Sequence, residues 1–312
     1  MKIKFSEKLN LANSETLISI IYFCAMNKEQ ILKALQEEVE GFNKIIATDK
    51  GDWIVKGFID IYKNIYTISI DTKVVSKVIE LLLIPAFETF AIKNNLTLEL
   101  PAQQNFYPDL TFICNATGAK FAVDIKSTFI DSENKIKSMT LGAFTGYFRN
   151  RQSTKNISYS YNSYSAHLVL GVVYKQNKEK LNEKVIYNLD EIDKIESVIK
   201  DFQFFVQPKY KIASASPGSG NTKNIGATTN LDSLINGKGI FSDLGEDIYN
   251  DFWMYYLTVD MAKALEIVRP YMNLKTYLEY KQRGIDVLTK HKDEINALNE
   301  IENNPEESDI NE

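Results

Sequence analysis

Three charged residues stand inside two short apolar segments of the chain. Asp109 occurs in "NFYPDLTF", and Asp124 and Lys126 occur in "FAVDIKS". Both segments are typical of β-strands, where a charge costs free energy unless it is paired, bound to a metal or neutralised. Because side chains alternate along a strand, Asp124 and Lys126 share one face. If the two strands pair, two carboxylates and one ammonium group meet.

Two carboxylates beside a lysine predict metal-dependent chemistry. Mg²⁺ takes one or two carboxylates and leaves positions for water and a substrate phosphate. Such a cation activates water and stabilises charge on the attacked phosphate, while Lys126 positions the water or helps to deprotonate it. The pattern is Pro-Asp, 14 intervening residues and then Asp-x-Lys, which is the arrangement of the PD-(D/E)XK nuclease superfamily. A solvent-facing Asp/Lys pair at a sheet edge is the alternative for so short a motif.

Other catalytic systems have little support in the sequence. The two histidines are His167, at the start of a predicted strand, and His291, so a Ser/His/Asp or Cys/His nucleophile is not expected. His167 is predicted to be packed and hydrogen-bonded. "GSGNTKN" matches neither common phosphate-loop motif. Cys24 and Cys114 lack C-x-x-C spacing, which argues against a disulfide framework or zinc site and favours a reducing cytoplasm.

The surrounding sequence predicts the elements that must hold these residues. Asp71 is the expected N-cap of a helix over residues 72–83. The charged strands are expected over 109–115 and 120–129. Residues 214–230, rich in Gly, Ser, Asn and Thr, predict a long loop. The other predicted elements are two helices within 15–48 interrupted near 26–29, a β-hairpin within 53–70 turning near Lys63–Asn64, a helix over 138–148, a strand over 167–174 and helical segments over 247–283.

Size and charge allow a large core and a polyanionic ligand. The chain has 312 residues, of which 44% are hydrophobic. The apolar run from Leu17 to Met26 is too short to span a bilayer and predicts a buried helix, so no membrane partner is expected. The net charge is −5, but nine acidic and two basic residues lie from Asp286 onward, which leaves 34 basic against 32 acidic residues elsewhere. The body of the chain is therefore free to carry basic clefts.

Several separated blocks point to one known family. In chain order they are "SIDTKVVSKVIEL", "PAQQNFYPDLTF", "AVDIKST", "TLGAFTGYFRN", "TKNISY", "AHLVLGVVY", "GSGNTKNIG" and "GKGIF". Through them residues 57–284 resemble the EcoRV-like type II restriction endonucleases. The resemblance implies an α/β fold with a mixed β-sheet core flanked by helices. The expected division is an N-terminal helical extension (1–35), an endonuclease domain with dimerisation and DNA-binding/catalytic subdomains (36–284) and an acidic tail (285–312) that frays after about Asn303.

The resemblance also implies roles for individual residues. Asp109 and Asp124 would bind the metal, Lys126 would be the catalytic lysine, and Glu80 would assist near the metal; from the sequence alone, Glu80 is better interpreted as a solvated helix residue. "GSGNTKN" would enter the major groove, where Asn can contact adenine and Thr the thymine methyl; a flexible linker is the alternative. The implied DNA contacts are Gln103, Gln104 and Asn105 in the minor groove, Gly218, Ser219, Gly220, Asn221, Thr222 and Asn224 in the major groove, and Thr72, Thr128 and Lys155 elsewhere.

Some positions depart from the family pattern. Lys223 stands in the recognition loop in place of a small polar residue, so it adds a phosphate contact or perturbs base reading. Ser127 replaces a threonine, Phe106 replaces a histidine, and one extra residue lies near Arg151. Residues 1–35 and the acidic tail have no counterpart in the family.

The resemblance implies a symmetric homodimer that cuts double-stranded DNA with Mg²⁺ at GATATC and leaves blunt ends. A two-fold axis lets each subunit read one half-site, and the central TA step favours recognition through bending. A cognate DNA methyltransferase is expected to be encoded nearby, without binding the enzyme. The alternatives are a repair-type or relaxed-specificity nuclease, a DNA-binding protein that does not cleave, and a protein-interaction domain with charged surface strands.

Overall fold

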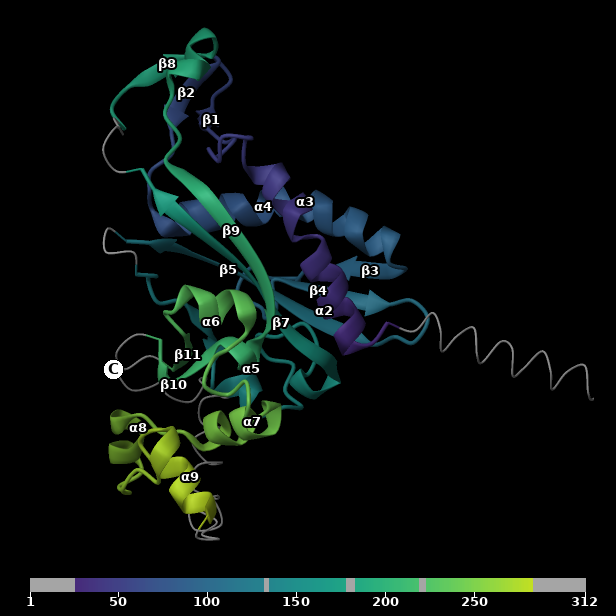
Figure 1. The fold of residues 1–312 in the computed structure, drawn as a ribbon, viewed down its shortest axis with the longest axis vertical. Coiled ribbons are helices and arrows are strands. Elements are labelled where there is room, and N and C mark those ends of the chain that lie inside the picture. The colour runs from purple at the N-terminus through teal and green to yellow at the C-terminus, as the bar shows by residue number, and fades with distance from the viewer. Residues whose placement is uncertain (1–25, 132–134, 178–182, 219–222, 283–312) are drawn as a thin grey trace, which may run out of the picture.

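A five-stranded mixed sheet forms the centre of the protein (Figure 1). The computed structural model describes residues 26–282 except 132–134, 178–182 and 219–222. In spatial order the main sheet contains β3 (Leu96–Glu99), β4 (Leu110–Cys114), β5 (Lys120–Ile130), β7 (Tyr164–Gln176) and β9 (Ile199–Pro208). β5 and β7 are parallel and the other neighbours are antiparallel. The predicted charged strands and the mixed sheet are therefore confirmed.

Alternating side chains of these strands pack into two hydrophobic cores, one on each face of the main sheet. On β5, Phe121 and Val123 belong to the first core and Ala122 to the second. The first core is covered by α2 (Lys28–Glu37), α3 (Val39–Ile46) and α4 (Thr72–Lys93). The predicted boundary at residue 35 falls inside α2, whose Ile31 and Leu35 are buried in this core.

The long helix α4 begins where the sequence predicts. The Asp71 side chain accepts hydrogen bonds from the backbone N–H groups of Lys73 and Val74, at 2.9 and 3.2 Å. These bonds confirm Asp71 as the N-cap. Val75 and Ile79 form the start of a buried stripe that continues through Phe87. Because this stripe continues, the helix ends at Lys93 rather than near residue 83.

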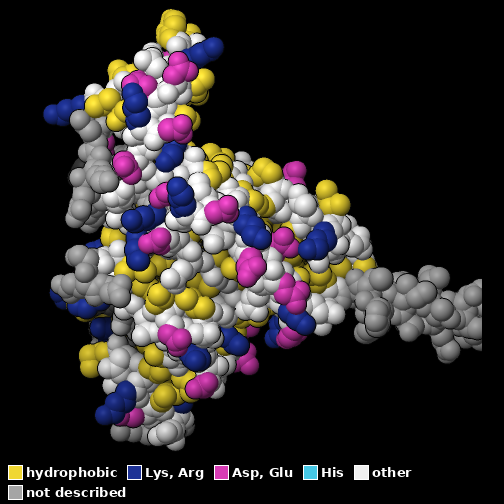
Figure 2. Space-filling model, turned by 45° about the horizontal axis from the view of Figure 1, so that its top comes forward, with side chains coloured by type: hydrophobic (Ala, Val, Ile, Leu, Met, Phe, Trp, Pro, Cys, Tyr) yellow, Lys and Arg dark blue, Asp and Glu magenta, His cyan; other side chains and the backbone are white. Residues whose placement is uncertain are grey.

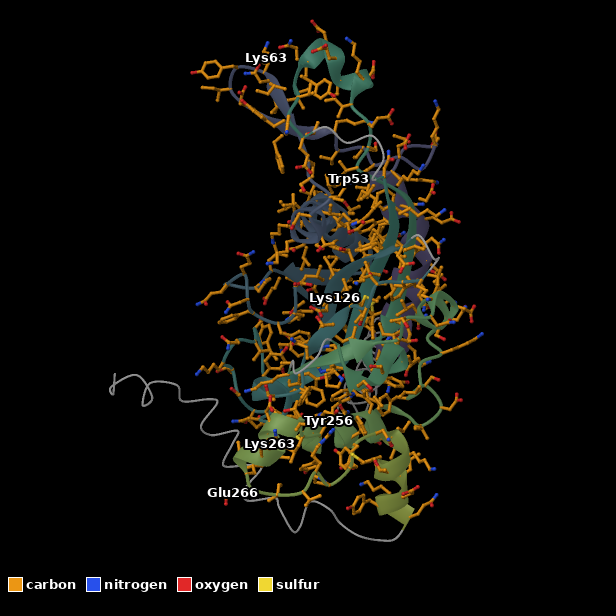
Figure 3. All side chains as sticks on the ribbon, turned by 90° about the vertical axis from the view of Figure 1, so that its left-hand side faces the viewer. Trp53, Lys63, Lys126, Tyr256, Lys263 and Glu266 are labelled. Atoms are coloured by element: carbon orange, nitrogen blue, oxygen red, sulfur yellow. The ribbon has the colours of Figure 1, made fainter. Side chains whose placement is uncertain are left out.

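A three-stranded antiparallel sheet projects from the body at the top of Figure 1. We call it the arm; it consists of β1 (Gly57–Ile59), β2 (Asn64–Thr67), β8 (Ile186–Asn188) and the following 3-10 helix (Leu189–Lys194). The Asp60 side chain accepts hydrogen bonds from the backbone N–H groups of Tyr62 and Asn64, and these bonds close the turn between β1 and β2. The predicted hairpin is thus confirmed. Figure 3 shows Lys63 at the far end of this hairpin.

A second small sheet lies on the second face of the main sheet and corrects two predictions. Its order is β10 (Ala213–Pro217), β11 (Asn224–Ala227) and β6 (Thr140–Ala143). The predicted helix over 138–148 is wrong, because this segment is β6 followed by a 3-10 turn at Gly146–Phe148. Gly142 and Gly146 have φ of +92° and +56°, which an α-helix does not use. The prediction that all of 214–230 is loop is also wrong, since 214–217 belong to β10 and 224–227 form β11.

The C-terminal part of the described chain is helical, as predicted. After the short helices α5 (Lys209–Ile212) and α6 (Leu231–Asn236) come α7 (Glu246–Tyr255), α8 (Val259–Ala264) and α9 (Leu274–Gln282). Phe252, Trp253 and Tyr271 join them to the second core. None of the helices described has the length and apolarity needed to cross a membrane. The first helix predicted within 15–48 and the fraying of the tail fall outside the described residues.

Gly171, in the middle of β7, permits close packing against β9. It pairs with Phe205, and a Cβ atom on Gly171 would overlap the Phe205 ring. Gly171→Ala should therefore lower the free energy of unfolding by about 1–3 kcal/mol, because strands on both sides prevent a local shift.

Urea unfolding followed by tryptophan fluorescence measures this change. Gly41→Ala in α3 is the matched control. There the new Cβ would lie 2.9 Å from the end of the flexible Glu38 side chain, and alanine favours the helix by up to ~1 kcal/mol. Equal stability of the two variants would contradict the packing argument.

His167 lies in an aromatic cluster rather than in a solvent-filled site. Its ring centroid is 3.8 Å from that of Tyr161, and its Nδ1 is 2.9 Å from the Tyr107 hydroxyl oxygen. Burial, followed by the positive charges of Lys209 and Arg151, holds the pKa of His167 well below 6.5. The prediction of a packed, hydrogen-bonded histidine is confirmed.

This burial predicts a pH-dependent contribution to stability. Below pH 6.5 the unfolded chain protonates His167 whereas the folded protein keeps it neutral. The contribution of His167 to stability should therefore fall as pH drops through 6.5, by at most about 1.4 kcal/mol per pH unit. His167→Gln should have a shallower fall in unfolding free energy than the wild type between pH 7 and 5. Parallel curves in urea titrations would refute this.

Candidate active site

The pairing of β4 with β5 brings Asp109 and Asp124 together. Leu110 pairs with Val123 in antiparallel register, so the next position on each strand places Asp109 beside Asp124. The Ile125 backbone N–H donates a hydrogen bond of 2.6 Å to Asp109 Oδ2, which fixes that carboxylate. The predicted convergence of the two carboxylates is confirmed.

Lys126 completes this charged cluster. Its Nζ lies 2.9 Å from Asp124 Oδ2 and 3.7 Å from Asp109 Oδ2. The Asp124 side chain is only 6% exposed, whereas Asp109 and Lys126 are partly exposed. Figure 3 shows Lys126 near the middle of the molecule, between Trp53 and Tyr256. Because β5 has a neighbour on each side and Asp124 is buried, a solvent-facing pair at a sheet edge does not describe this arrangement.

The two carboxylates differ in their electrostatic surroundings. Burial, followed by the charge of Asp124, raises the pKa of Asp109 to about 7. Burial also raises the pKa of Asp124, but the ammonium groups of Lys126 and Lys209 outweigh it and hold that pKa below its ordinary value. For Lys126, burial lowers the pKa, and Asp124 and Asp109 together raise it overall. One firmly ionised carboxylate thus stands beside one that accepts a proton near neutral pH.

The carboxylate pair fits a divalent cation. Asp124 Oδ2 is shielded from solvent and receives no hydrogen bond of good geometry, although the Lys126 ammonium lies beside it as an ion pair. Such an oxygen retains the capacity to bind a hard cation. In the part of the chain that the structure describes, no group of three His, Cys, Asp or Glu side chains is placed to hold a metal ion. Two carboxylates supplemented by water and phosphate oxygens are a ligand set that Mg²⁺ accepts.

Glu80 lies on α4 and is not in direct contact with this cluster. Its carboxylate pairs with Lys77 Nζ at 2.6 Å. One turn earlier, Ser76 Oγ lies 2.6 Å from Ser127 Oγ, which ties α4 to the strand residue after Lys126. Residues four apart share a stripe of a helix, so Glu80 follows Ser76 along this side of α4.

The residues expected to contact DNA lie in several surface segments around the cluster. Gln103, Gln104 and Asn105 are exposed in the turn that precedes Asp109. Gly218 N donates to Asn224 O at 3.0 Å, so these two residues close the base of the β10–β11 hairpin. Ser219, Gly220, Asn221 and Thr222 fall outside the described residues.

Three more expected contact residues have different environments. Thr72 is exposed at the first turn of α4. Thr128 is buried and its hydroxyl donates to Lys137 O at 2.5 Å. Lys155 lines a hollow of about 310 Å³ together with Lys223 and Tyr147. This hollow brings the unusual Lys223 to the same place as Lys155, which the sequence did not predict.

Lys209 is a buried residue near the cluster that the sequence did not predict. It is 3% exposed, and its Nζ lies 4.0 Å from the centre of the Tyr107 ring. Burial lowers the pKa of Lys209 to about 8. A signal exists in "FFVQPKYKIASA", where Lys209 directly follows an apolar strand and a proline, but only the fold shows that its side chain turns inward.

Comparison with known proteins identifies the family. Residues 49–282 match the family model described as restriction endonuclease EcoRV. The type II restriction enzyme EcoRV of Escherichia coli is 35% identical over 232 residues, which cover 74% of this chain and 91% of that protein. The solved NlaIV restriction endonuclease matches with a TM-score of 0.33 and 10% identity, over 78% of this chain and 94% of that one. The family match and the identity to EcoRV show that this chain belongs to the EcoRV family and is a type II restriction endonuclease.

Proposed function

We propose that this enzyme hydrolyses phosphodiesters of double-stranded DNA with Mg²⁺ at the palindrome GATATC and leaves blunt ends. The observation that carries the proposal is the convergence of Asp109, Asp124 and Lys126 on paired strands. The "GSGNTKN" segment, with its Gly-Ser-Gly-Asn-Thr core, supports GATATC as the recognised DNA site. Lys223 is the position at which a different or relaxed specificity would arise.

In this proposal Asp109 and Asp124 hold the cation, and Glu80 assists from α4. Bound Mg²⁺ would supply the positive charge that activates water and stabilises negative charge on the attacked phosphate. Burial lowers the pKa of Lys126, but the charges of Asp124 and Asp109 raise it overall. Lys126 would position the attacking water as a cationic hydrogen-bond donor, or help to deprotonate it once bound Mg²⁺ offsets the charge of the carboxylates.

DNA would be read by two segments. The hairpin segment from Gly218 to Asn224 would enter the major groove, where base edges are distinguishable. Gln103, Gln104 and Asn105 would follow the minor groove beside the phosphate that is cut. The exposure of these three residues in the turn before Asp109 supports a minor-groove contact. One short segment would then carry both the side chains that contact the groove and the carboxylate of Asp109. Thr72, Thr128 and Lys155 would contact DNA or couple recognition to cutting.

The enzyme would act as a symmetric homodimer joined through the arm. Exposed apolar residues gather there, including Phe58, Ile59, Ile61, Tyr62 and Ile186. Figure 2 shows hydrophobic atoms on the upper projection, interspersed with charged side chains. Apolar surface of this kind marks an interface, and a second copy brings a second identical site for the opposite DNA strand.

The remaining parts of the proposal concern the cellular setting and the ends of the chain. The enzyme would act in the cytoplasm, and a cognate methyltransferase encoded nearby would protect host DNA. Residues 1–35 would form a helical extension, 36–284 the endonuclease domain and 285–312 an acidic tail.

Cleavage of plasmids tests the proposed reaction. With Mg²⁺, the protein should linearise a plasmid with one GATATC site, leave blunt ends and spare a plasmid without the site. Asp109→Ala and Lys126→Ala should each lower the rate by at least roughly a hundredfold, since each removes a charge from the reacting centre. Glu88→Ala, an exposed carboxylate on α4, should cut normally.

Other outcomes would each reject part of this proposal. Cutting at another defined sequence would reject GATATC and direct attention to Lys223. Unspecific degradation would favour a relaxed-specificity nuclease. Tight DNA binding by the folded wild type without cleavage would reject hydrolysis.

Sedimentation velocity tests the arm as the dimer interface. The double variant Ile59→Glu, Ile61→Glu should weaken dimerisation roughly a hundredfold or more, because burying charged groups in place of apolar ones costs several kcal/mol. Val268→Glu with Met272→Glu is the matched control, since Val268 and Ile61 are each 87% exposed. Dissociation of the control, or an intact dimer in the arm variant, would place the interface elsewhere.

A further inference from the structure

Lys209 is a buried ammonium group that the proposed reaction does not use. It is the first residue of α5 and has 3% of its surface exposed. Among the residues described, no carboxylate lies within ion-pair distance of its Nζ; its direct partner is the face of the Tyr107 ring, at 4.0 Å. A buried cation without an ion pair is costly even over an aromatic ring, so a side chain that only filled space would be better apolar.

The contact with Tyr107 places the Lys209 ammonium beside the segment that leads into Asp109. Tyr107 stands two residues before Asp109, and its ring stacks on that of Tyr147 with centroids 5.2 Å apart. Its backbone is held on both sides, because Tyr107 N donates to Asn156 O at 3.0 Å and Ser158 N donates to Tyr107 O at 2.8 Å. A change in the position of the Lys209 ammonium would therefore act on a segment that is otherwise fixed.

The same charge acts on the carboxylates. After Lys126, Lys209 is the next largest charge that lowers the pKa of Asp124. Among the residues described, Lys209 forms no ion pair with Asp124, so its charge acts on that carboxylate from a distance.

The backbone of Lys209 belongs to a different functional segment. It lies between the end of β9 and β10, the first strand of the hairpin whose base is closed by Gly218 and Asn224. The end of α5 is anchored to this hairpin, because Thr228 N donates to Ile212 O at 2.9 Å and Ala213 pairs with Ala227. One residue thus joins the root of the DNA-reading hairpin to the loop that carries Asp109.

We propose that Lys209 is a positioning residue that couples seating of the β10–β11 hairpin on DNA to the placement of Asp109 and Asp124. This inference rests on the proposed function and deepens it. Movement of the hairpin root shifts the ammonium against the Tyr107 ring, and the changed ring position adjusts the side chain of Asp109 two residues later while the Tyr107 backbone stays anchored. In this role Lys209 acts through the Tyr107 ring, which its ammonium contacts.

The decisive variant is Lys209→Met, which keeps the length of the side chain and removes the charge. Its kcat on the sequence that the wild type cuts should fall at least tenfold. KM, and the affinity for a duplex of that sequence without divalent cation, should stay within threefold. The urea midpoint should be unchanged or higher, because the cost of the buried charge disappears. Lys211→Met, on the same short helix, is the control and should match the wild type in all these measurements.

A double-variant cycle tests the route through Tyr107. Tyr107→Phe keeps the ring and should retain activity, whereas Tyr107→Leu should lose about as much as Lys209→Met. The variant with both Tyr107→Leu and Lys209→Met should lose no more than either alone.

Three results would overturn the inference. A loss of both stability and activity in Lys209→Met would indicate a purely structural role. An unchanged kcat in Lys209→Met, or additive losses of activity when Tyr107→Leu and Lys209→Met are combined, would also contradict it. Absence of cleavage by the wild type is a separate result, because it rejects the proposed function itself before any variant is compared.

Discussion

The proximity of Asp109 and Asp124 within a rigid sheet is the constraint on which the rest of the structure depends. Like charges in a shielded place repel each other, and burial followed by the charge of Asp124 raises the pKa of Asp109. Three groups offset it: the Lys126 ammonium, the Ile125 N–H and, from below, the Lys209 ammonium. The carboxylates cannot separate, because β5 is held between β4 and β7. The sheet therefore maintains an arrangement that favours a cation.

The two faces of the main sheet have different tasks. The first face is covered by α2, α3 and α4 over an apolar core, and it supplies rigidity. The second face carries the charged cluster, the aromatic layer of Tyr107, Tyr147 and Tyr161, and the small sheet that presents the hairpin. On the first face, Ser76 of α4 contacts Ser127, the residue that follows Lys126 on β5. The charged cluster and the hairpin proposed to contact DNA thus lie on one side of a sheet that is stabilised from the other.

Local patterns could predict some features of this protein but not others. The alternation through Ala122, Asp124 and Lys126, the Asp71 cap and the arm hairpin depend on neighbouring residues, and all three are confirmed. The segment 138–148 was mispredicted because its strand is fixed by a partner, β11, some 80 residues away in sequence. The burial of Lys209 arises from the packing of α5 against Tyr107; its position after an apolar strand and a proline does not show that the side chain turns inward. The roles proposed for Glu80 and the hairpin loop rest on the resemblance to the EcoRV family, because no local pattern distinguishes these residues from a solvated helix glutamate and a linker.

The parallel pairing of β5 with β7 also constrains how the chain folds. Parallel strands require a long crossover, and residues 131–163 form it here. This crossover carries β6, the outer strand that supports the β10–β11 hairpin. The hairpin can close early because its contacts are local, but it acquires β6 only when the crossover is in place. We therefore expect partly folded chains to lack the finished hairpin surface that is proposed to contact DNA, so that this surface forms together with the completed main sheet.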